Sequence, residues 1–323
     1  MRSHAMYDIS IILCTYNGAK YIEDQLDSIA NQTILPSELI SCDDISTDNT
    51  VSIIKAWSIH YKGKVILRKN ETRLGVIKNF EQGMCLASGD YIMFCDQDDV
   101  WLPNKIEVTL RKMQELERQY GKNHPCLVHT DLRVVDENLA IIADSFLENQ
   151  GLHHVEDATA QVKNLLAQNF VTGCTVMINR SLCQLAIPFP PHVIMHDYWL
   201  ALVAALGGTL AFVDKPTILY RQHGDNSVGA RKYISCASLV RVLNWSQLMQ
   251  GVRGILAQGM ELLTFKGGLL LGKHQYVRDF FDNLAHGRIC QTLTFGTRKQ
   301  GFIRNFIYYF ALLSILIERK RFI

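Results

Sequence analysis

The sequence predicts an α/β protein with a mixed, mostly parallel sheet flanked by helices, followed by a helical extension at the C-terminal end. Three observations predict this fold class. In the first 120 residues, short apolar runs typical of buried strands alternate with segments of helical periodicity, which indicates βαβ units. Acidic side chains directly follow two of these runs, where a parallel sheet would gather them at one edge. From about residue 234 onward the pattern is helical, with residues 287–301 as a break.

Length and composition describe a globular protein without a marked bias. The 323 residues suffice for one large domain or two smaller ones, with 48% hydrophobic and 20% charged residues. A formal net charge of +2 predicts no nucleic-acid partner. Neither a Gly-x-Gly-x-x-Gly nor a Walker A pattern occurs, which argues against Rossmann dehydrogenases and P-loop ATPases.

The cysteines and the N-terminal residues bear on the expected compartment. Nine cysteines are scattered without Cys-x-x-Cys spacing, which favours a reducing compartment over a disulfide framework or a zinc site. The opening residues, MRSHAMYD, lack the apolar core of a signal peptide. Since no apolar run reaches the roughly 18 residues of a spanning helix, we expect a cytoplasmic protein.

The first half of the chain predicts four strands, each followed by a helix. The strands are the apolar runs at residues 9–13, 39–42, 65–67 and 91–95. Helices with apolar residues at helical spacing are expected at about residues 22–29, 51–58, 75–87 and 103–120. This order predicts the nucleotide-binding half of an α/β domain, which we place at residues 1–120.

The second half alternates less regularly. Strands are expected at residues 126–130, 174–179 and 210–213, with helices at 157–168 and 198–206 and a loop at 220–224. We assign residues 121–230 to the acceptor half of the same domain. Residues 231–323 form the predicted helical C-terminal region.

The most informative stretch is residues 89–101, GDYIMFCDQDDVW. Its apolar run suits a buried central strand and ends abruptly in Asp96, Asp98 and Asp99. Three carboxylates within four residues repel one another, and a cation or a cationic ligand would offset that cost. A solvated acidic turn before the next helix is the alternative.

Further polar residues follow the neighbouring strands. Asp43 and Asp44 end the second strand, and Thr15 and Tyr16 end the first. A parallel sheet would bring these groups and the later acids to one edge. Because Mg²⁺ and Mn²⁺ are held by one or two carboxylates together with phosphate oxygens, this edge favours a nucleotide diphosphate ligand.

In order, these motifs resemble the nucleotide-sugar half of the inverting family 2 glycosyltransferases, which have the GT-A fold. The matching stretches are residues 10–12, 15–17, 43–50, Gly75 and 89–99. Residues 96–101, 196–199 (His-Asp-Tyr-Trp) and 220–226 are similar to bacterial rhamnosyltransferase-type members that build O-antigen and capsule. The resemblance covers residues 8 to about 230, and the Gln-x-x-Arg-Trp signature of processive synthases is absent, which favours transfer of a single sugar.

The resemblance implies a role for each matching position. It places Thr15 and Asp44 at the nucleobase with Asp43 beside them, and Asp98 at the ribose or sugar. Asp99 would ligate Mn²⁺ or Mg²⁺, and Asp197 would be the catalytic base. The further candidates are Tyr16, Asn17 and Asn79 for nucleotide contacts, Asp98 and His223 as additional metal ligands, and Arg221, Gly173, His196 and Trp199 elsewhere in the site. The residues alone also allow Asp197 to be a helix cap and His223 a loop hydrogen-bonder.

The C-terminal tail has a composition suited to a membrane surface. Residues 302–317 are strongly apolar, with Arg298, Lys299 and Arg304 at their start and three basic residues at 319–321. Such a helix can lie in an anionic membrane surface with its basic ends on phosphate headgroups. The alternative is a helix docked on the protein core or in a dimer interface. We expect peripheral association with the cytoplasmic membrane.

Together these features predict a metal-dependent inverting glycosyltransferase. It would move one sugar from a nucleotide-diphosphate donor to a lipid-linked oligosaccharide or another glycan, with L-rhamnose from dTDP-rhamnose as the first expectation and a UDP-hexose (glucose or galactose) as the alternative. A nucleotidyltransferase would carry a Gly-rich basic loop after the first strand, where this chain has Thr-Tyr-Asn-Gly-Ala-Lys. A catalytically silent, glycan-binding subunit would have lost the acids, and all of them are present.

Overall fold

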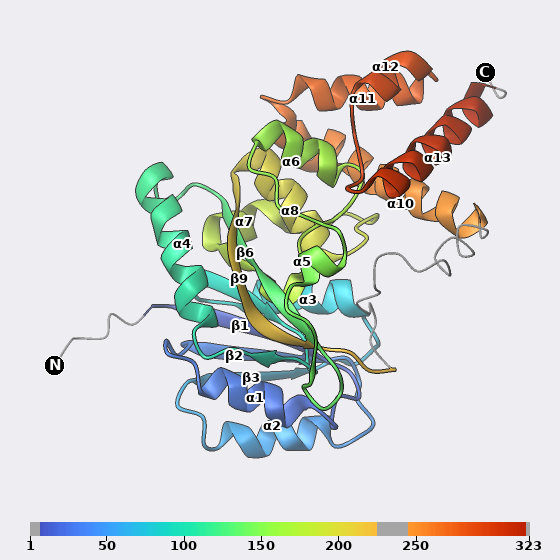
Figure 1. Cartoon of the computed structure of the whole chain (residues 1–323). Coiled ribbons are helices and arrows are strands. Elements are labelled where there is room, and N and C mark those ends of the chain that lie inside the picture. Colours follow the sequence, from blue (N-terminus) through green and yellow to red (C-terminus); the bar gives the residue numbers. More distant parts are fainter. Residues whose placement is uncertain (1–6, 225–244, 321–323) are drawn as a thin grey trace.

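The computed structural model describes residues 7–224 and 245–320, and its centre is one twisted sheet of nine strands (Figure 1). The strands follow the spatial order β3-β2-β1-β4-β8-β6-β9-β5, with β7 paired to β6. Four strands of the first half pair in parallel: β1 (Ile9–Thr15), β2 (Glu38–Asp43), β3 (Lys64–Lys69) and β4 (Tyr91–Cys95). The expected α/β fold class is confirmed.

The register of the parallel strands explains why the polar residues converge. Thr15 is paired with Asp43, and Leu13 with Cys95, so β1, β2 and β4 end close to one another. Every residue of β4 is buried, as expected for a central strand whose two faces are both covered. The residues that follow these strands therefore lie at one edge of the sheet.

The second half completes the sheet with strands of both directions. The short β8 (Met177–Asn179) runs antiparallel between β4 and β6 (Cys126–Val135), and β9 (Thr209–Arg221) runs parallel to β6. Two further short strands, β5 (Val100–Trp101) and β7 (Ile141–Ala143), pair with β9 and β6.

Helices cover both faces of the sheet and form two hydrophobic cores. One core contains apolar residues of α1 (Ile22–Ala30), α2 (Thr50–Ser58) and α4 (Lys105–Tyr120). The other contains α3 (Val76–Leu86), α6 (Ala158–Leu165), α7 (Arg180–Ala186) and α8 (His196–Gly207). A short helix, α5 (Phe146–Asn149), lies after β7.

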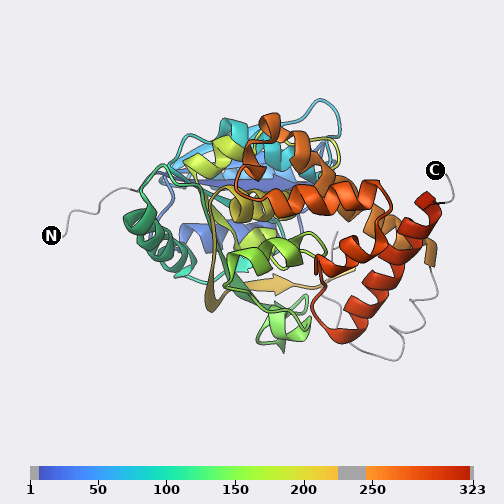
Figure 2. The same ribbon diagram turned by 90° about the horizontal axis from the view of Figure 1, so that it is seen from above.

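The C-terminal helices extend the second core. They are α10 (Trp245–Thr264), α11 (Gln275–Ala285), α12 (Ile289–Thr294) and α13 (Phe302–Lys320), with a 3-10 segment at Phe265–Leu271. Buried residues such as Met249, Phe280 and Tyr308 belong to the same cluster as α8. Figures 1 and 2 show these helices gathered at one end of the molecule, with α13 at its periphery. The division of the chain at residue 230 stays a prediction.

Several boundaries differ from the expected ones. The strands expected at 126–130 and 210–213 are longer, and β9 takes in Tyr220 and Arg221, which were expected in a loop. Only residues 177–179 of the strand expected at 174–179 are paired, because residues 173–175 form a 3-10 turn. Helix α12 lies within the expected break at 287–301, and the expected helical residues 234–244 lie outside the described part.

Two expected absences can be checked over the described ranges. No helix there combines the length and the apolar character that a membrane crossing requires. The eight cysteines of those ranges form no disulfide.

Candidate active site

A cleft of about 650 Å³ lies at the carboxyl ends of β1, β2 and β4. We call its two sides the donor wall and the acceptor wall, after the two substrates that the sequence resemblance leads us to expect. The donor wall consists of residues that follow these strands or begin α3: Thr15, Tyr16, Asp44, Arg73, Gly75, Asn79, Asp96, Gln97 and Asp98. The acceptor wall consists of residues from α5, the segment 168–173, the start of α8, and α13: Phe146, Gln150, Gln168, Asn169, Gly173, His196, Asp197 and Arg304.

Asp44 is fixed firmly in the donor wall. Its carboxylate accepts hydrogen bonds from the backbone N–H of Leu74 (2.7 Å) and Gly75 (2.9 Å) and from the amide of Asn70 (3.0 Å). Gly75 has a φ of 76°, a conformation that favours glycine. Burial would raise the pKa of Asp44, but these hydrogen bonds lower it below its usual value. The group is therefore a fixed anionic acceptor beside Thr15 and Asn79.

Asp43 and Asn17 stabilise the loops of the donor wall and do not line the cleft. Asp43 is fully buried and accepts hydrogen bonds from the hydroxyl of Thr15 (3.0 Å) and the N–H of Ser46 (2.9 Å). The side-chain oxygen of Asn17 accepts a hydrogen bond from the N–H of Thr47 (2.8 Å). Their polar atoms hold the two loops together, and the expected nucleotide contacts of both residues stay predictions.

Tyr16 forms a flat surface at the edge of the donor wall. Its ring is 38% exposed, and the guanidinium carbon of Arg73 lies 3.9 Å from the ring centroid. Both residues line the cleft. Arg73 was not anticipated, because an isolated basic residue in a loop carries no recognisable pattern in the sequence.

Asp98 and His223 are brought together across 125 residues of chain. The Nε2 atom of His223 lies 2.8 Å from Oδ2 of Asp98, and both side chains are largely buried. The His223 ring also packs on Tyr21, with centroids 4.7 Å apart. Asp98 lines the cleft, and the expected role of both residues as metal ligands stays a prediction.

Asp96 also lines the cleft, although no individual role was predicted for it. Burial raises its pKa to about 7, and the carboxylates of Asp98 and Asp197 add to the effect. Asp197 belongs to the opposite wall, so this interaction shows that acids of the two walls are electrostatically linked. Asp96 is the first acid of the Asp-Gln-Asp-Asp motif. The spacing of these acids in the sequence does not show which of them face the cleft.

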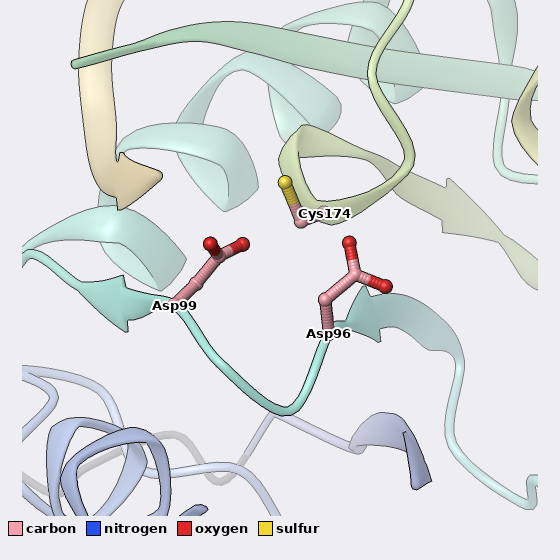
Figure 3. A group of neighbouring side chains, drawn as sticks. All are labelled: Asp96, Asp99 and Cys174. Carbon is pink, nitrogen blue, oxygen red and sulfur yellow. The ribbon is translucent and has the colours of Figure 1, made fainter. Parts of the chain in front are cut away.

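Asp99 points away from the cleft into the interior. Its side chain, that of Asp96 and the thiol of Cys174 point toward one space, with ligand atoms within 4.8 Å of one another (Figure 3). Asp99 is fully buried, and its Oδ1 accepts the N–H of Arg221 at 3.1 Å. Burial raises its pKa well above the usual range. Of the three residues only Asp96 lines the cleft, and the expected role of Asp99 as a metal ligand stays a prediction.

Arg221 supports the donor wall from behind. Its side chain is almost fully buried and donates hydrogen bonds to the carbonyl oxygens of Asp98 (2.9 Å) and Glu137 (2.7 Å) and to the carboxylate of Asp24 (2.7 Å). It does not line the cleft. These contacts favour a positioning role of Arg221 for the loop of Asp98, and its expected part in the site stays a prediction.

Asp197 lies in the first turn of α8, on the acceptor wall. Its Oδ1 accepts the N–H of Tyr198 at 2.6 Å. Burial raises its pKa to about 7, while hydrogen bonds from the N–H of Gly173 and the amide of Asn169 moderate the increase. A carboxyl with a pKa near neutrality can both take up and release a proton at neutral pH.

Residue 173 must be glycine because its backbone lies very close to His196 and Asp197. A β-carbon at this position would lie 2.7 Å from Nε2 of His196 and 3.5 Å from Oδ2 of Asp197. The His196 ring packs on Phe80 with centroids 3.9 Å apart, so it has little room to move. Gly173 and His196 thus form the immediate support of Asp197, as positioning residues.

Trp199 belongs to the hydrophobic core and does not line the cleft. It is fully buried, donates a hydrogen bond to the carbonyl oxygen of Ala186 (3.0 Å) and contacts Phe265 edge-to-face. These contacts favour a place in the core, and its assignment as a site residue stays a prediction. It anchors α8 against α7 and the C-terminal helices.

The residues present suit a hard divalent cation at the donor wall. Asp96 and Asp98 offer carboxylate oxygens at the cleft, and His223 offers an imidazole nitrogen beside Asp98. Carboxylate and imidazole ligands suit Mn²⁺, and carboxylates suit Mg²⁺. The buried group of Asp99 and Cys174 is less suitable, because the fully buried Lys105 already contributes positive charge next to it.

Comparison with known proteins extends these observations. A sequence model of the Glycosyl transferase family 2 matches residues 10–183. The dTDP-rhamnosyl transferase RfbG of Shigella flexneri is 30% identical over 234 residues, which are 68% of this chain and 74% of RfbG. The UDP-Glc:alpha-D-GlcNAc-diphosphoundecaprenol beta-1,3-glucosyltransferase WfgD of Escherichia coli is 30% identical over 277 residues, which are 85% of this chain and 97% of WfgD.

A solved structure supports the assignment of the fold. The mannosyltransferase PcManGT from Pyrobaculum calidifontis, in complex with GDP-Man and Mn²⁺, has a TM-score of 0.51 at 16% identity. The similarity covers 98% of this chain and 88% of PcManGT, so it extends over the C-terminal helices as well as the sheet.

Proposed function

Because the chain belongs to glycosyl transferase family 2 and has its GT-A fold, we propose that it is a metal-dependent inverting enzyme that transfers a single sugar. The observation that carries this proposal is the placement of acids on opposite walls of one cleft. Asp96 and Asp98 lie on the donor wall and Asp197 on the acceptor wall. A single displacement needs this arrangement, with the leaving group on one side of the reacting carbon and the base on the other.

The donor wall would bind a nucleoside diphosphate. Thr15, Asp44 and Asn79 offer acceptors and donors for the base and ribose, and Tyr16 with Arg73 offers a surface for the ring. Asp98 and His223, with Asp96 beside them, would hold Mn²⁺ or Mg²⁺. A divalent cation supplies Lewis-acid stabilisation of the negative charge on a departing diphosphate.

Asp197 would accept the proton of the attacking hydroxyl. The carboxylate is held by Tyr198, and its neighbours Gly173 and His196 leave little freedom for rotation. A new bond would form between the acceptor oxygen and the anomeric carbon as the bond to the diphosphate breaks. The configuration at the anomeric carbon would invert, because the two walls face the carbon from opposite sides.

For the donor we propose dTDP-rhamnose, with a UDP-hexose as the second candidate. The first rests on RfbG, whose name gives a dTDP-rhamnosyl transferase, and on the motifs at 96–101, 196–199 and 220–226. The second rests on WfgD, whose name gives UDP-Glc. WfgD has the same 30% identity to this chain, and the match covers 97% of its length.

For the acceptor we propose a lipid-linked glycan of a bacterial surface polysaccharide such as O-antigen or capsule. The name of WfgD gives a sugar-diphosphoundecaprenol acceptor, which would lie in a membrane. The enzyme would then act at the cytoplasmic face as a peripheral protein.

A thermal-shift panel tests the donor proposal first. Thymidine, uridine and guanosine diphosphates are each compared with and without Mn²⁺, since a ligand that binds the folded state raises its melting temperature. Stabilisation by thymidine diphosphate only with Mn²⁺ is expected for the rhamnosyl donor, and a uridine preference would shift the proposal to a hexose. No stabilisation by any nucleotide, together with no slow hydrolysis of dTDP-rhamnose or UDP-glucose, would favour a silent glycan-binding subunit.

A further inference from the structure

Helix α13 presents two different faces near the cleft. Three phenylalanines spaced four residues apart project from its outer side, and we call Phe302, Phe306 and Phe310 the aromatic face. They are 87%, 66% and 55% exposed, which is unusual for such large apolar side chains. On the other side of the helix, Tyr308 and Leu312 are fully buried in the core.

Arg304 comes from the inner side of the first turn and lines the acceptor wall. Among the residues that the structure describes, it is the one Lys or Arg of that wall. At 100° per residue, position 304 lies on the same side of the helix as the buried 308 and 311, and away from 302 and 306. One helix therefore provides a cation to the cleft and an apolar surface to the outside.

The start of α13 is held in a fixed position relative to the catalytic base. The side chain of Gln300 is hydrogen-bonded to both the N–H (2.5 Å) and the carbonyl oxygen (2.7 Å) of His153. Its own N–H donates to Oε1 of Gln168 (3.0 Å). The next residue, Asn169, is a hydrogen-bond partner of Asp197. These contacts connect the segment before Arg304 to the segment that supports the base.

A second hollow, of about 350 Å³, lies at the start of the helix. It is lined by polar, basic and aromatic residues, among them Arg298, Lys299, Asn305 and Phe302. Lys299 is half-buried, and within the described ranges no carboxylate lies at ion-pair distance from it. Burial and the nearby charge of Arg304 lower the pKa of Lys299 to about 8. The half-buried ammonium group of Lys299 would be stabilised by an anion.

The local sequence reinforces this charge. Between residues 283 and 317 the chain has four Lys or Arg and no Asp or Glu. A ligand that matches both these basic residues and the exposed aromatic face has an anionic group next to a long apolar chain. A polyprenyl diphosphate has this chemistry, and its glycan would have to reach Asp197 from the diphosphate end.

We propose that the start of α13 is the subsite for the diphosphate of a lipid-linked acceptor, with Arg304 and Lys299 binding the diphosphate and the aromatic face receiving the hydrocarbon chain. This inference rests on the proposed function, which supplies the acceptor class. It assigns to the C-terminal helices a direct part in substrate binding. Phosphate oxygens would accept charge-assisted hydrogen bonds from the two side chains.

Calorimetric titration with farnesyl diphosphate tests the subsite. The buffer contains EDTA, so that the probe cannot use a divalent cation at the donor wall. Arg304→Gln should weaken binding by about tenfold or more, the effect of losing a hydrogen bond to a charged group. The matched control is Arg288→Gln, which removes an exposed positive charge of the same region that lines neither opening; it should change the affinity by no more than about twofold.

Further variants separate the two parts of the ligand. Lys299→Gln should weaken both farnesyl diphosphate and inorganic pyrophosphate, whereas Phe306→Gln should weaken only the former. Phe306 is exposed, so its replacement leaves the core intact, and the melting temperature of each variant verifies folding. The proposal is overturned if farnesyl diphosphate does not bind the wild-type protein, if Arg304→Gln binds it like the wild type, or if Arg288→Gln is equally weakened.

A parallel measurement keeps this result distinct from the proposed function. Binding of nucleoside diphosphates with Mn²⁺ to the wild-type protein depends on the donor wall and not on α13. If nucleoside diphosphates do not bind but Arg304→Gln still weakens the binding of farnesyl diphosphate, the glycosyl donor proposal fails and the proposed anion site is supported. If nucleotides bind and farnesyl diphosphate does not, only the acceptor subsite is overturned.

Discussion

Asp44 on the donor wall and Asp197 on the acceptor wall are in opposite electrostatic states. On the donor wall, Asp44 receives three hydrogen bonds, and its pKa is lowered despite burial. On the acceptor wall, burial dominates at Asp197 and raises its pKa to about 7. A fixed anion suits the binding of hydroxyl and amide donors, whereas a carboxyl near neutrality suits proton transfer. The difference teaches that the environment of each acid, more than its motif, indicates its role.

The largest effect is expected from Asp197→Asn. Removing the base should lower the transfer rate by about 10²- to 10⁴-fold, while nucleoside diphosphate binding stays near the wild-type level. Transfer is measured with labelled donor and binding by calorimetry. Asp157→Asn is the matched control, because Asp157 also caps a helix, accepting the N–H of Ala160 at 2.7 Å, and lies outside the cleft. Full activity of Asp197→Asn would show that Asp197 only caps helix α8.

The second comparison sets Asp98 against Asp99. Asp98→Asn should weaken Mn²⁺-dependent nucleotide binding by about 10- to 100-fold, the range seen when metal sites lose a supporting group. Asp99→Asn should change this binding much less, because its side chain lies beneath the cleft. Titrations with and without Mn²⁺ measure both variants. An equal loss in Asp99→Asn would show that the interior acid takes part in metal binding after all.

A smaller effect is expected when the support of the base is disturbed. In Gly173→Ala, the added methyl would force His196 to shift and displace Asp197 with it. Turnover should fall by about tenfold or more, because a small misplacement of a catalytic group slows the reaction. The nucleotide affinity should stay unchanged. Gly251→Ala, in α10, is the control, since its β-carbon would meet open space. Equal turnover in the two variants would mean that the close approach at residue 173 has no catalytic consequence.

The pH dependence gives the most gradual effect. Because Asp197 acts in its ionised form and burial raises its pKa to about 7, kcat/KM should decrease as the pH falls below 7. The decrease should approach about tenfold per pH unit. The residual activity of Asp197→Asn should lack the part of this limb that comes from residue 197, and what remains should reflect Asp96, whose pKa burial also raises to about 7. A wild-type profile that stays flat down to pH 5 would contradict the raised pKa of the base.

The parallel half of the fold and most of the donor wall could be predicted from the sequence. Buried strands ending in Thr15, Asp44 and Asp98 are local patterns, and the register of a parallel sheet brings their ends together. The sequence also indicated Asp197, because a matching motif identified it. These residues could be predicted because their positions depend mainly on neighbouring residues in the sequence.

Tertiary structure alone decided which acids face the cleft and which residues complete it. Asp96, Asp98 and Asp99 share one loop, and only its path between β4 and β5 turns Asp99 inward and leaves the other two at the cleft. The contacts of Arg221 with Asp98 and of Trp199 with Ala186 likewise join distant segments, and they favour a supporting role for both residues. Arg304 reaches the acceptor wall through the packing of α13, more than a hundred residues after Asp197. Contacts between such distant segments depend on the packing of the whole chain, so no local pattern encodes them.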